Sequence, residues 1–248
     1  MGSVQEAKEA KEAKEATETA VGRRVVLGML GVGVAGVLYG AKAADLLERV
    51  IGPIASKDGA GFLSLFPVGR FRIYTVTNEL PNMAATNYRL TVDGAVSSPL
   101  VLTLDEVRAM PAVRMTKDFQ CVTGWRVHDV KWTGVRLSDV LDRAGASSTA
   151  QGVRFISFDG VYTETLTMKQ AQRADVIVAY EMDGRPVSRA HGGPVRMYVA
   201  PMYGYKSCKW LGKIEVTEGD PGIGYWEVRG YDTDGWVGKS NRRDDKPI

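Results

Sequence analysis

Apolar and polar residues alternate along several short stretches of the chain, which is typical of strands with one buried face. Turn-forming pairs lie at the ends of some of these stretches, as Asp93-Gly94 and Asp159-Gly160 do. A further extended run begins near Val113 and leads to Cys121. We therefore expect strands at residues 71–76, 88–92, 153–158, 162–166, 176–180, 195–199 and 213–217.

Short helices are expected between these strands. Thr103 and Glu106 have the spacing of a capping box, in which each side chain bonds a backbone N–H of the other, and Thr167 with Gln170 repeats it. Residues 137–144 are amphipathic with helical period and end before a glycine. No regular βαβ alternation and no GxGxxG motif is present. The pattern predicts an α+β fold with mixed sheets and short helices rather than a doubly wound sheet.

Composition divides the chain of 248 residues into five parts. A Glu/Ala/Lys repeat without an apolar face comes first and predicts a solvated helix or a disordered tail. A glycine-containing linker separates the second part from the globular domain. The aromatic residues of the fifth, C-terminal part are expected to pack back onto the domain, with partner docking as the alternative. The boundaries are 1–20 for the charged tail, 21–44 for an export signal or anchor, 45–69 for the linker, 70–220 for the globular domain and 221–248 for the C-terminal extension.

The second part has the features of an export segment. Arg23-Arg24 precedes an uncharged, glycine-rich run at residues 25–41, which is near the short limit for crossing a bilayer. The arrangement is similar to a twin-arginine signal, although Gly22 stands where Ser or Thr is usual and Val26 where Phe is usual. We expect an extracytoplasmic protein, in the periplasm or on the outer face of the cell membrane, with either a cleaved signal or a retained anchor.

The overall charge and the rare residues exclude several classes of function. A net charge of +3, with no basic run among aromatics, argues against a nucleic-acid partner. Two cysteines cannot build a disulfide scaffold, and two histidines, His128 and His191, exclude most multi-histidine metal sites.

Cys121 has the most informative surroundings of any residue. It follows an extended run and precedes Gly124, so a thiol at the end of a strand has few neighbours around it. The alternatives are a small buried residue or a disulfide with Cys208. Two further blocks are distinctive: His-Gly-Gly-Pro-Val-Arg at residues 191–196 and Tyr-Gly-Tyr-Lys-Ser-Cys-Lys-Trp at residues 203–210.

The Cys-Val-Thr-Gly-Trp segment at residues 121–125 and these two blocks resemble, in order and spacing, the catalytic domain of the sulfite-oxidase-like molybdopterin enzymes. The resemblance covers about residues 71–217 and implies the sulfite-oxidase-type fold and a molybdenum–molybdopterin cofactor. It implies that Cys121 is the metal ligand and that His191 contacts the cofactor, where an ordinary turn residue is the alternative. It also implies a cofactor-binding set that comprises Asn78, Cys121, Asp159, His191, Arg196, Lys206, Ser207, Cys208 and Lys209.

The roles within this set differ. Arg196, Lys206 and Lys209 are expected to supply positive charge to the cofactor phosphate, since arginine binds phosphate in bidentate fashion and lysine acts as a point charge. Ser207, with Gly204, allows a close backbone approach to the anion. Cys208 is expected to contribute only its backbone and to remain a free, structural thiol. Asn78 is the only residue that this chain keeps from the Arg-Asn-His stretch of the family. Asp159 is equally suited to a turn.

The resemblance further implies oxygen-atom transfer on a small sulfur-containing substrate. The residues after Cys121 are closer to those of bacterial exported reductases than to the Ala-Gly-Asn-Arg of sulfite oxidases, although Arg126 could serve an anion pocket. Without a Cys-x-x-Cys-His haem motif, electrons must be exchanged with a separate protein, for which a membrane cytochrome or quinone-linked subunit is the hypothesis. The alternatives are a sulfite oxidase proper, an exported binding module that keeps the fold without catalysis, and an envelope protein with paired cysteines.

Overall fold

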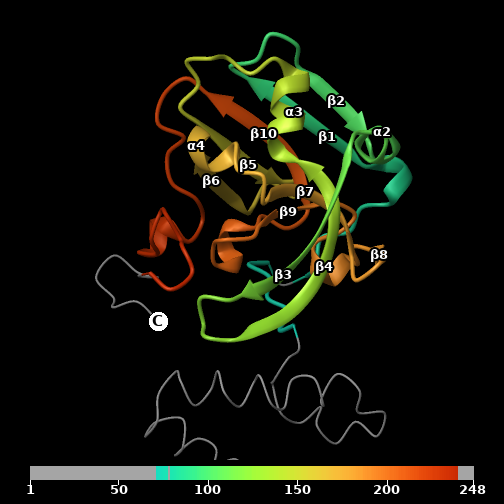
Figure 1. Cartoon of the computed structure of the whole chain (residues 1–248), viewed down its shortest axis with the longest axis vertical. Helices are drawn as coiled ribbons and strands as arrows, with labels where there is room; N and C mark the ends of the chain where they lie inside the picture. Colours follow the sequence, from blue (N-terminus) through green and yellow to red (C-terminus); the bar gives the residue numbers. More distant parts are fainter. Residues whose placement is uncertain (1–70, 78, 240–248) are drawn as a thin grey trace, which may run out of the picture. The chain divides into compact units, whose positions relative to one another are not determined.

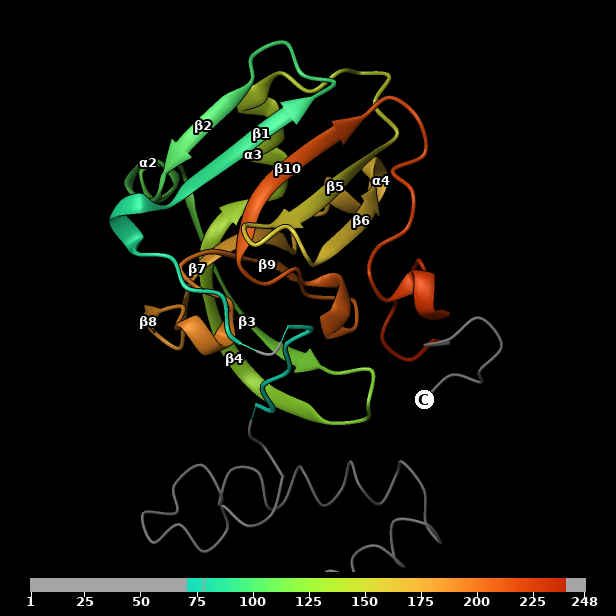
Figure 2. The same ribbon diagram turned by 180° about the vertical axis from the view of Figure 1, so that it is seen from behind.

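Two five-stranded β-sheets form the domain in the computed structural model, which describes residues 71–77 and 79–239 (Figures 1 and 2). The charged tail, the paired arginines, the linker and Asn78 lie outside the described residues. Within the described part of the chain, no helix has the length and apolarity needed to cross a bilayer. The sheets and short helices confirm the expected α+β class.

The first sheet has the order β2-β1-β10-β5-β6. Its central pair, β1 and β10, is parallel, with Thr91 opposite Lys213, and the other pairs are antiparallel. It is therefore a mixed sheet, as the sequence pattern predicts. The strands are β1 (Arg89–Gly94), β2 (Leu100–Thr103), β5 (Gly152–Ser157), β6 (Thr163–Thr167) and β10 (Leu211–Thr217).

The second sheet is antiparallel and centred on β7. That strand pairs with β4 and β9, and with β8 at its C-terminal end, while β3 pairs with β4. In Figures 1 and 2, β3 and β4 extend away from the first sheet as a long hairpin. The strands are β3 (Ala112–Gln120), β4 (Arg126–Arg136), β7 (Val176–Met182), β8 (Arg185–Pro186) and β9 (Arg196–Val199).

The helices are short and begin where the capping signals predict. Thr103 and Thr167 both form complete capping boxes, with Glu106 and Gln170 respectively. Gly145 takes the left-handed conformation that ends a helix, at φ 64°. The helices are α2 (Leu104–Arg108), α3 (Leu137–Ala144) and α4 (Met168–Ala171), with single 3₁₀ turns η2 (Ala85–Asn87), η3 (Arg189–His191), η4 (Gly204–Lys206) and η5 (Glu227–Arg229).

The main hydrophobic core fills the space between the two sheets. Helix α3 contacts β1 of one sheet and β4 and β7 of the other, and it buries Leu137, Val140 and Leu141. A second cluster, which includes Phe119, Trp125 and Trp132, is built on β3, β4 and β7. It supports the end of β3, at which Cys121 lies.

The strand prediction omits β2, β4 and β8 and includes one segment that forms no strand. Residues 71–76 are extended but form no strand, and they run along a cavity instead. Strand β4 is missing from the prediction because its pattern is not alternating: its second half is buried on both faces, and Asp129 has a left-handed φ of 54°. Residue period alone cannot identify a strand of this kind.

Candidate active site

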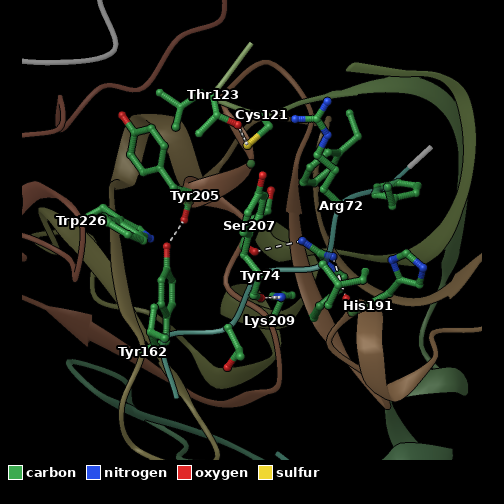
Figure 3. Close-up of a pocket in the computed structure, with 18 of the residues that line it drawn as sticks. Arg72, Tyr74, Cys121, Thr123, Tyr162, His191, Tyr205, Ser207, Lys209 and Trp226 are labelled. Carbon is green, nitrogen blue, oxygen red and sulfur yellow. Dashed lines mark hydrogen bonds between the residues drawn. The ribbon is translucent and has the colours of Figure 1, made fainter. Parts of the chain in front are cut away.

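A cavity of about 330 Å³ collects residues from distant parts of the chain. It lies beside the end of β3, and the sheets bring to it residues from the β3–β4 turn and from the chain around β9. No Asp or Glu side chain is among the described residues that line it, whereas three cations are, namely Arg72, Arg196 and Lys209. The surface is otherwise largely aromatic and apolar. Figure 3 shows Cys121 and Thr123 at one end, with Lys209 and Tyr162 toward the other.

A tight turn between β3 and β4 holds Cys121. The Cys121 N–H donates to the Trp125 carbonyl at 2.9 Å, and the Gly124 N–H donates to the Cys121 carbonyl at 3.1 Å. Gly124 has φ +92°, which favours glycine. The Cys121 Sγ lies 3.2 Å from the Thr123 hydroxyl oxygen, in the lining of the cavity. The turn therefore presents a half-buried thiol to the cavity.

Both cysteines are free. Cys208 is completely buried in the main core, and burial raises the pKa of its thiol. The alternative of a Cys121–Cys208 disulfide is therefore wrong, and the expectation that Cys208 is a free thiol is confirmed. Cys208 does not line the cavity in the described structure, and its carbonyl accepts the Met197 N–H at 2.8 Å.

Arg196, at the start of β9, contacts the backbone of both sequence blocks, residues 191–196 and 203–210. Its guanidinium donates to the carbonyl oxygens of His191 at 2.7 Å, Ser207 at 3.1 Å and Met197 at 3.1 Å. The group is also 5.5 Å from the ring centroids of Phe119 and Trp132. Burial lowers its pKa to about 10, so it remains charged at neutral pH. Arg196 thus carries a buried positive charge while it orders the backbone of the cavity.

His191 and Lys209 are the other two titratable groups that the sequence predicts and the cavity contains. Burial, then the charges of Arg196 and Lys209, lowers the pKa of His191, so the imidazole is neutral at neutral pH. Burial and the charge of Arg196 lower the pKa of Lys209 to about 7. The Lys209 ammonium donates to the Tyr74 carbonyl and lies 4.4 Å from the Trp210 ring centroid. A desolvated positive region of this kind favours an anion.

Close backbone packing joins these blocks at Gly192. Its φ is +98°, and a Cβ atom there would lie 2.6 Å from the Cβ of Lys209. The Trp210 N–H donates to the Gly192 carbonyl at 2.9 Å, and the Ser207 hydroxyl oxygen accepts the Val199 N–H at 2.9 Å. Only glycine allows the His191 turn to approach Lys209 this closely.

Besides Cys208, two expected cofactor-binding residues, Lys206 and Asp159, and the possible anion-pocket residue Arg126 lie outside the lining of the cavity. Lys206 is completely buried and its ammonium contacts two carboxylates, Glu164 and Glu227, so the expectation that it binds phosphate is wrong. Asp159 accepts hydrogen bonds from the Ser157 hydroxyl and the Val161 N–H and does not line the cavity, which fits the turn alternative. Arg126 donates to the Gln120 side chain and also lies outside the lining.

Two walls of the cavity were not predicted from the sequence. One is the extended segment 71–76, whose Phe71 ring lies 5.3 Å from Phe119 and 4.8 Å from His191. The other is a group of aromatic side chains, Tyr162, Tyr205, Trp226 and Tyr231, which we call the aromatic wall. Trp226 and Tyr231 are visible in the sequence as aromatic residues of the extension, but no local pattern relates them to Cys121.

The residues present suit a molybdenum–pterin group. Among the described residues, no three His, Cys, Asp or Glu side chains gather as a metal site, so a metal at Cys121 must bring most of its ligands. A pterin dithiolene does this and leaves one position for a soft thiolate. The cations suit its phosphate, and the buried Trp125 Nε1–H has no acceptor in the described part of the chain. The cavity therefore matches the chemistry of the cofactor.

Comparison with known proteins gives the same family. Residues 77–226 match the family model described as "Oxidoreductase molybdopterin binding domain". The oxidoreductase YuiH of Bacillus subtilis is 35% identical over 147 residues, which is 59% of this chain and 73% of the relative. The putative protein-methionine-sulfoxide reductase subunit YedZ1 of Azospira oryzae is 34% identical over 170 residues, 68% of this chain and 63% of the relative.

A solved structure supports the fold. The sulfane dehydrogenase SoxCD of Paracoccus pantotrophus aligns with a TM-score of 0.54 and 18% identity, over 66% of this chain and 46% of that one. At this identity the likeness concerns the fold alone. The family match covers more than half of the chain, and the cavity has the residues such a cofactor requires. The chain therefore belongs to the sulfite-oxidase-like molybdopterin oxidoreductases, with molybdenum–molybdopterin as its cofactor.

Proposed function

We propose that the Cys121 thiolate is the protein ligand of the molybdenum and that the protein transfers an oxygen atom to or from a small sulfur-containing substrate. The observation that carries the proposal is a free, half-buried thiol in a cavity whose described lining residues carry positive charge and no carboxylate. When bound, the cofactor supplies the oxygen-transfer chemistry and passes electrons singly to another carrier.

The turn after β3 prepares Cys121 for this role. A metal bound here would hold Cys121 as the thiolate, because a metal-bound thiol is deprotonated. The Thr123 hydroxyl, 3.2 Å from the sulfur, can then donate a hydrogen bond to the thiolate. Trp125 and Phe119 stack with ring centroids 5.8 Å apart and shield this side of the cavity from water. Cys121 would thus hold the metal, and the turn and the Thr123 hydroxyl orient Cys121.

The chain around β9 is suited to the anionic part of the cofactor. Lys209 provides an ammonium in the lining of the cavity, and Arg196 provides a buried charge bonded to the Ser207 carbonyl. An anion near Lys209 would favour the protonated form of the lysine and raise its pKa from about 7. His191, neutral and half-buried, can donate or accept a hydrogen bond at the pterin edge.

For the direction of reaction we favour sulfoxide reduction. One sulfoxide takes up two electrons and two protons, the S–O bond breaks, and a sulfide and water are released. The apolar, aromatic lining suits a neutral organic compound, and the relative YedZ1 carries the name of a putative methionine-sulfoxide reductase subunit. The electrons come from a separate redox protein, for which a membrane cytochrome is our candidate.

Sulfite oxidation is the second candidate, and Arg72 favours it. Arg72 is exposed, lines the cavity and lies on the Cys121 side in Figure 3, so it could attract a small anion. Assays of Arg72→Met with sulfite and ferricyanide, and with methionine sulfoxide and reduced viologen, separate the two. A sulfite oxidase loses sulfite turnover in this variant, whereas a sulfoxide reductase keeps its activity.

Metal analysis and a pair of cysteine variants test the proposed ligand. Cys121→Ala should lose the Mo(V) paramagnetic signal and turnover, because the metal loses its only protein thiolate. The matched control is Cys208→Ala, which removes the other thiol, outside the cavity, and should keep both. A Cys121→Ala protein with full turnover, or a native protein without molybdenum, would contradict the proposal.

The extracytoplasmic location is proposed from the twin-arginine-like segment at residues 21–44. A cofactor assembled in the cytoplasm requires export of a folded protein, and this route carries folded cargo. Replacing Arg23 and Arg24 together by lysine should leave the protein in the cytoplasmic fraction. Export of that variant at the native level would contradict the proposal.

A further inference from the structure

Three charged side chains meet behind the aromatic wall, out of contact with water. The Lys206 ammonium donates to Glu164 Oε1 at 2.5 Å and to Glu227 Oε1 at 2.7 Å. The exposed fractions of these side chains are 0% for Lys206, 0% for Glu164 and 1% for Glu227. Burial at this level is exceptional for charged residues and persists only where they are paired.

The cluster is electrically balanced by one proton. It holds two carboxyl groups and one ammonium, and the Oε2 atoms of both glutamates are buried and without a hydrogen-bond partner in the described part of the chain. Burial, and then the neighbouring Glu227, raises the pKa of Glu164 well above its ordinary value. A proton on one carboxyl group, shared with the other, makes the cluster neutral. Loss of Lys206 then leaves a buried carboxylate without a cation, and loss of either carboxyl group removes one of the two hydrogen bonds that the ammonium donates.

Each member of the cluster adjoins a residue of the aromatic wall. Tyr162 is two positions before Glu164, Tyr205 directly precedes Lys206, and Trp226 directly precedes Glu227. All three aromatic residues line the cavity, as Tyr231 does. The cluster therefore joins β6, η4 and η5 at the places where each contributes to the wall.

Other contacts lock the same three segments together. The Tyr162 hydroxyl donates to the Tyr205 carbonyl at 2.6 Å, and the Tyr205 hydroxyl donates to the Asp232 carbonyl at 2.5 Å. The Tyr231 ring lies 5.5 Å from Tyr205 and 5.3 Å from Trp226. A Cβ atom at Gly224 would lie 2.5 Å from Glu227 Oε2, so the backbone approaches the cluster directly. The C-terminal segment is thus packed against β6 and η4 and forms part of the cavity wall.

The position of the wall determines what it can contact. In Figure 3, Tyr205 and Trp226 lie on one side of the pocket, and Arg72 and His191 lie on the other. Aromatic faces attract apolar groups and sulfur, and their negative quadrupole does not attract an anion. This side therefore suits the organic substituent of a neutral sulfoxide.

We propose that the Glu164–Lys206–Glu227 cluster is a positioning device that holds Trp226 and Tyr231 as the wall that binds the organic substituent of a sulfoxide substrate. The proposal rests on the proposed oxygen-transfer function and adds a substrate class to it. It places the preference for larger organic sulfoxides in the C-terminal segment rather than at Cys121.

Kinetics with two sulfoxides of different size test the wall in the full-length, cofactor-loaded protein. For Trp226→Ala, the KM for methyl phenyl sulfoxide should rise about tenfold with kcat nearly unchanged, as expected for a lost aromatic contact. Dimethyl sulfoxide, which is too small to use the wall, should keep both constants within about twofold. Trp226→Phe should restore most of the affinity for the aryl compound.

Glu227→Ala tests the cluster, because it removes the carboxyl group that joins η5 to the Lys206 ammonium. The same loss of preference for methyl phenyl sulfoxide is expected, together with faster proteolysis of the C-terminal segment. The matched control is Val228→Ala, the next residue, whose side chain is 66% exposed and should change nothing. Molybdenum content and the Mo(V) signal should stay native in all these variants.

A measurement without turnover complements the kinetics. Equilibrium dialysis of thioanisole, the sulfide product, should show about tenfold weaker binding to Trp226→Ala than to the native protein. Equal effects on both sulfoxides, or none, in an active Trp226→Ala enzyme would overturn the proposed binding role of the wall and leave the proposed oxygen-transfer function standing. A Glu227→Ala enzyme of native selectivity would overturn the positioning role. A native enzyme that holds molybdenum but turns over neither sulfoxide would overturn the proposed function, and the wall with it.

Discussion

Lys206 and Lys209 are three positions apart in one motif, yet they have opposite surroundings. Lys206 has two carboxylates within 2.7 Å and no exposed surface. Lys209 faces a cavity without a lining carboxylate, beside the buried charge of Arg196, and its pKa falls to about 7. Lys206, bound to two carboxyl groups, stabilises the wall of the site. Lys209, which has no carboxylate partner in the described structure, is available to an anionic ligand.

The difference shows why positive charge alone does not identify an anion site. Both lysines are close to the cavity, and both stand in the sequence among the glycine, serine and aromatic residues expected at an anion site. The partners of each ammonium decide its role, since a lysine that two carboxylates neutralise attracts no further anion. Changing the two lysines one at a time should therefore have different consequences.

Lys206→Met should have the largest effect, on stability. It leaves two buried carboxyl groups without their cation, and removal of one partner from a buried ion pair typically costs about 3–5 kcal/mol. Urea denaturation of the native protein and the variant measures this change. A loss below about 1 kcal/mol, typical of an exposed pair, would contradict the buried cluster.

Lys209→Met should instead weaken cofactor binding and leave the fold intact. The loss of a hydrogen bond to a charged group is worth about 1.5–3 kcal/mol, or roughly ten- to a hundredfold in affinity. Molybdenum per polypeptide after extensive dilution measures the loss, and the urea midpoint of the cofactor-free protein serves as control. Full retention of molybdenum would show that Lys209 does not contact the cofactor.

The pH dependence of stability gives the most specific difference between the two lysines. In the cofactor-free protein the unfolded chain protonates Lys209 below about 10.5, whereas the folded chain does so only below about 7. The unfolded state therefore binds more protons between these values, and the free energy of unfolding should rise with pH by up to about 1.4 kcal/mol per pH unit.

Below about pH 7 both states carry the proton, and the destabilisation by Lys209 is complete. Lys209→Met should remove this slope, so the difference between the two proteins, measured by urea denaturation from pH 7 to 10, isolates it. Parallel stability curves for the two proteins would mean that the lysine is not desolvated in the folded state.

Local features of the fold were predictable from the sequence. The capping boxes at Thr103 and Thr167, the helix at residues 137–144 and several strands follow from residue period and from side-chain bonds to nearby backbone. Strand β4 could not be predicted in this way, because its second half is buried on both faces and shows no alternation of apolar and polar residues. Segment 71–76 alternates like a strand, but it pairs with no sheet and lies along the cavity.

The site was predictable in part. Cys121, His191, Arg196, Ser207 and Lys209 were expected at the cofactor and line one cavity. The partners of Lys206 were not foreseeable, because Glu164 is 42 positions before it and Glu227 is 21 positions after it. Asp159 could be assigned to a turn or to the pterin, and only its hydrogen bonds to Ser157 and Val161 favour the turn.

By itself the sequence determined the α+β class, the capped helices, the resemblance that gives the cofactor, and the thiol at the end of a strand. These features depend on residue period and on contacts within a few positions. Only the tertiary structure decided which lysine faces the cavity, which carboxylates neutralise the other, and which aromatic rings line the site. Pairing between distant segments is set by how the sheets and the C-terminal segment pack, and no local pattern of residues encodes it.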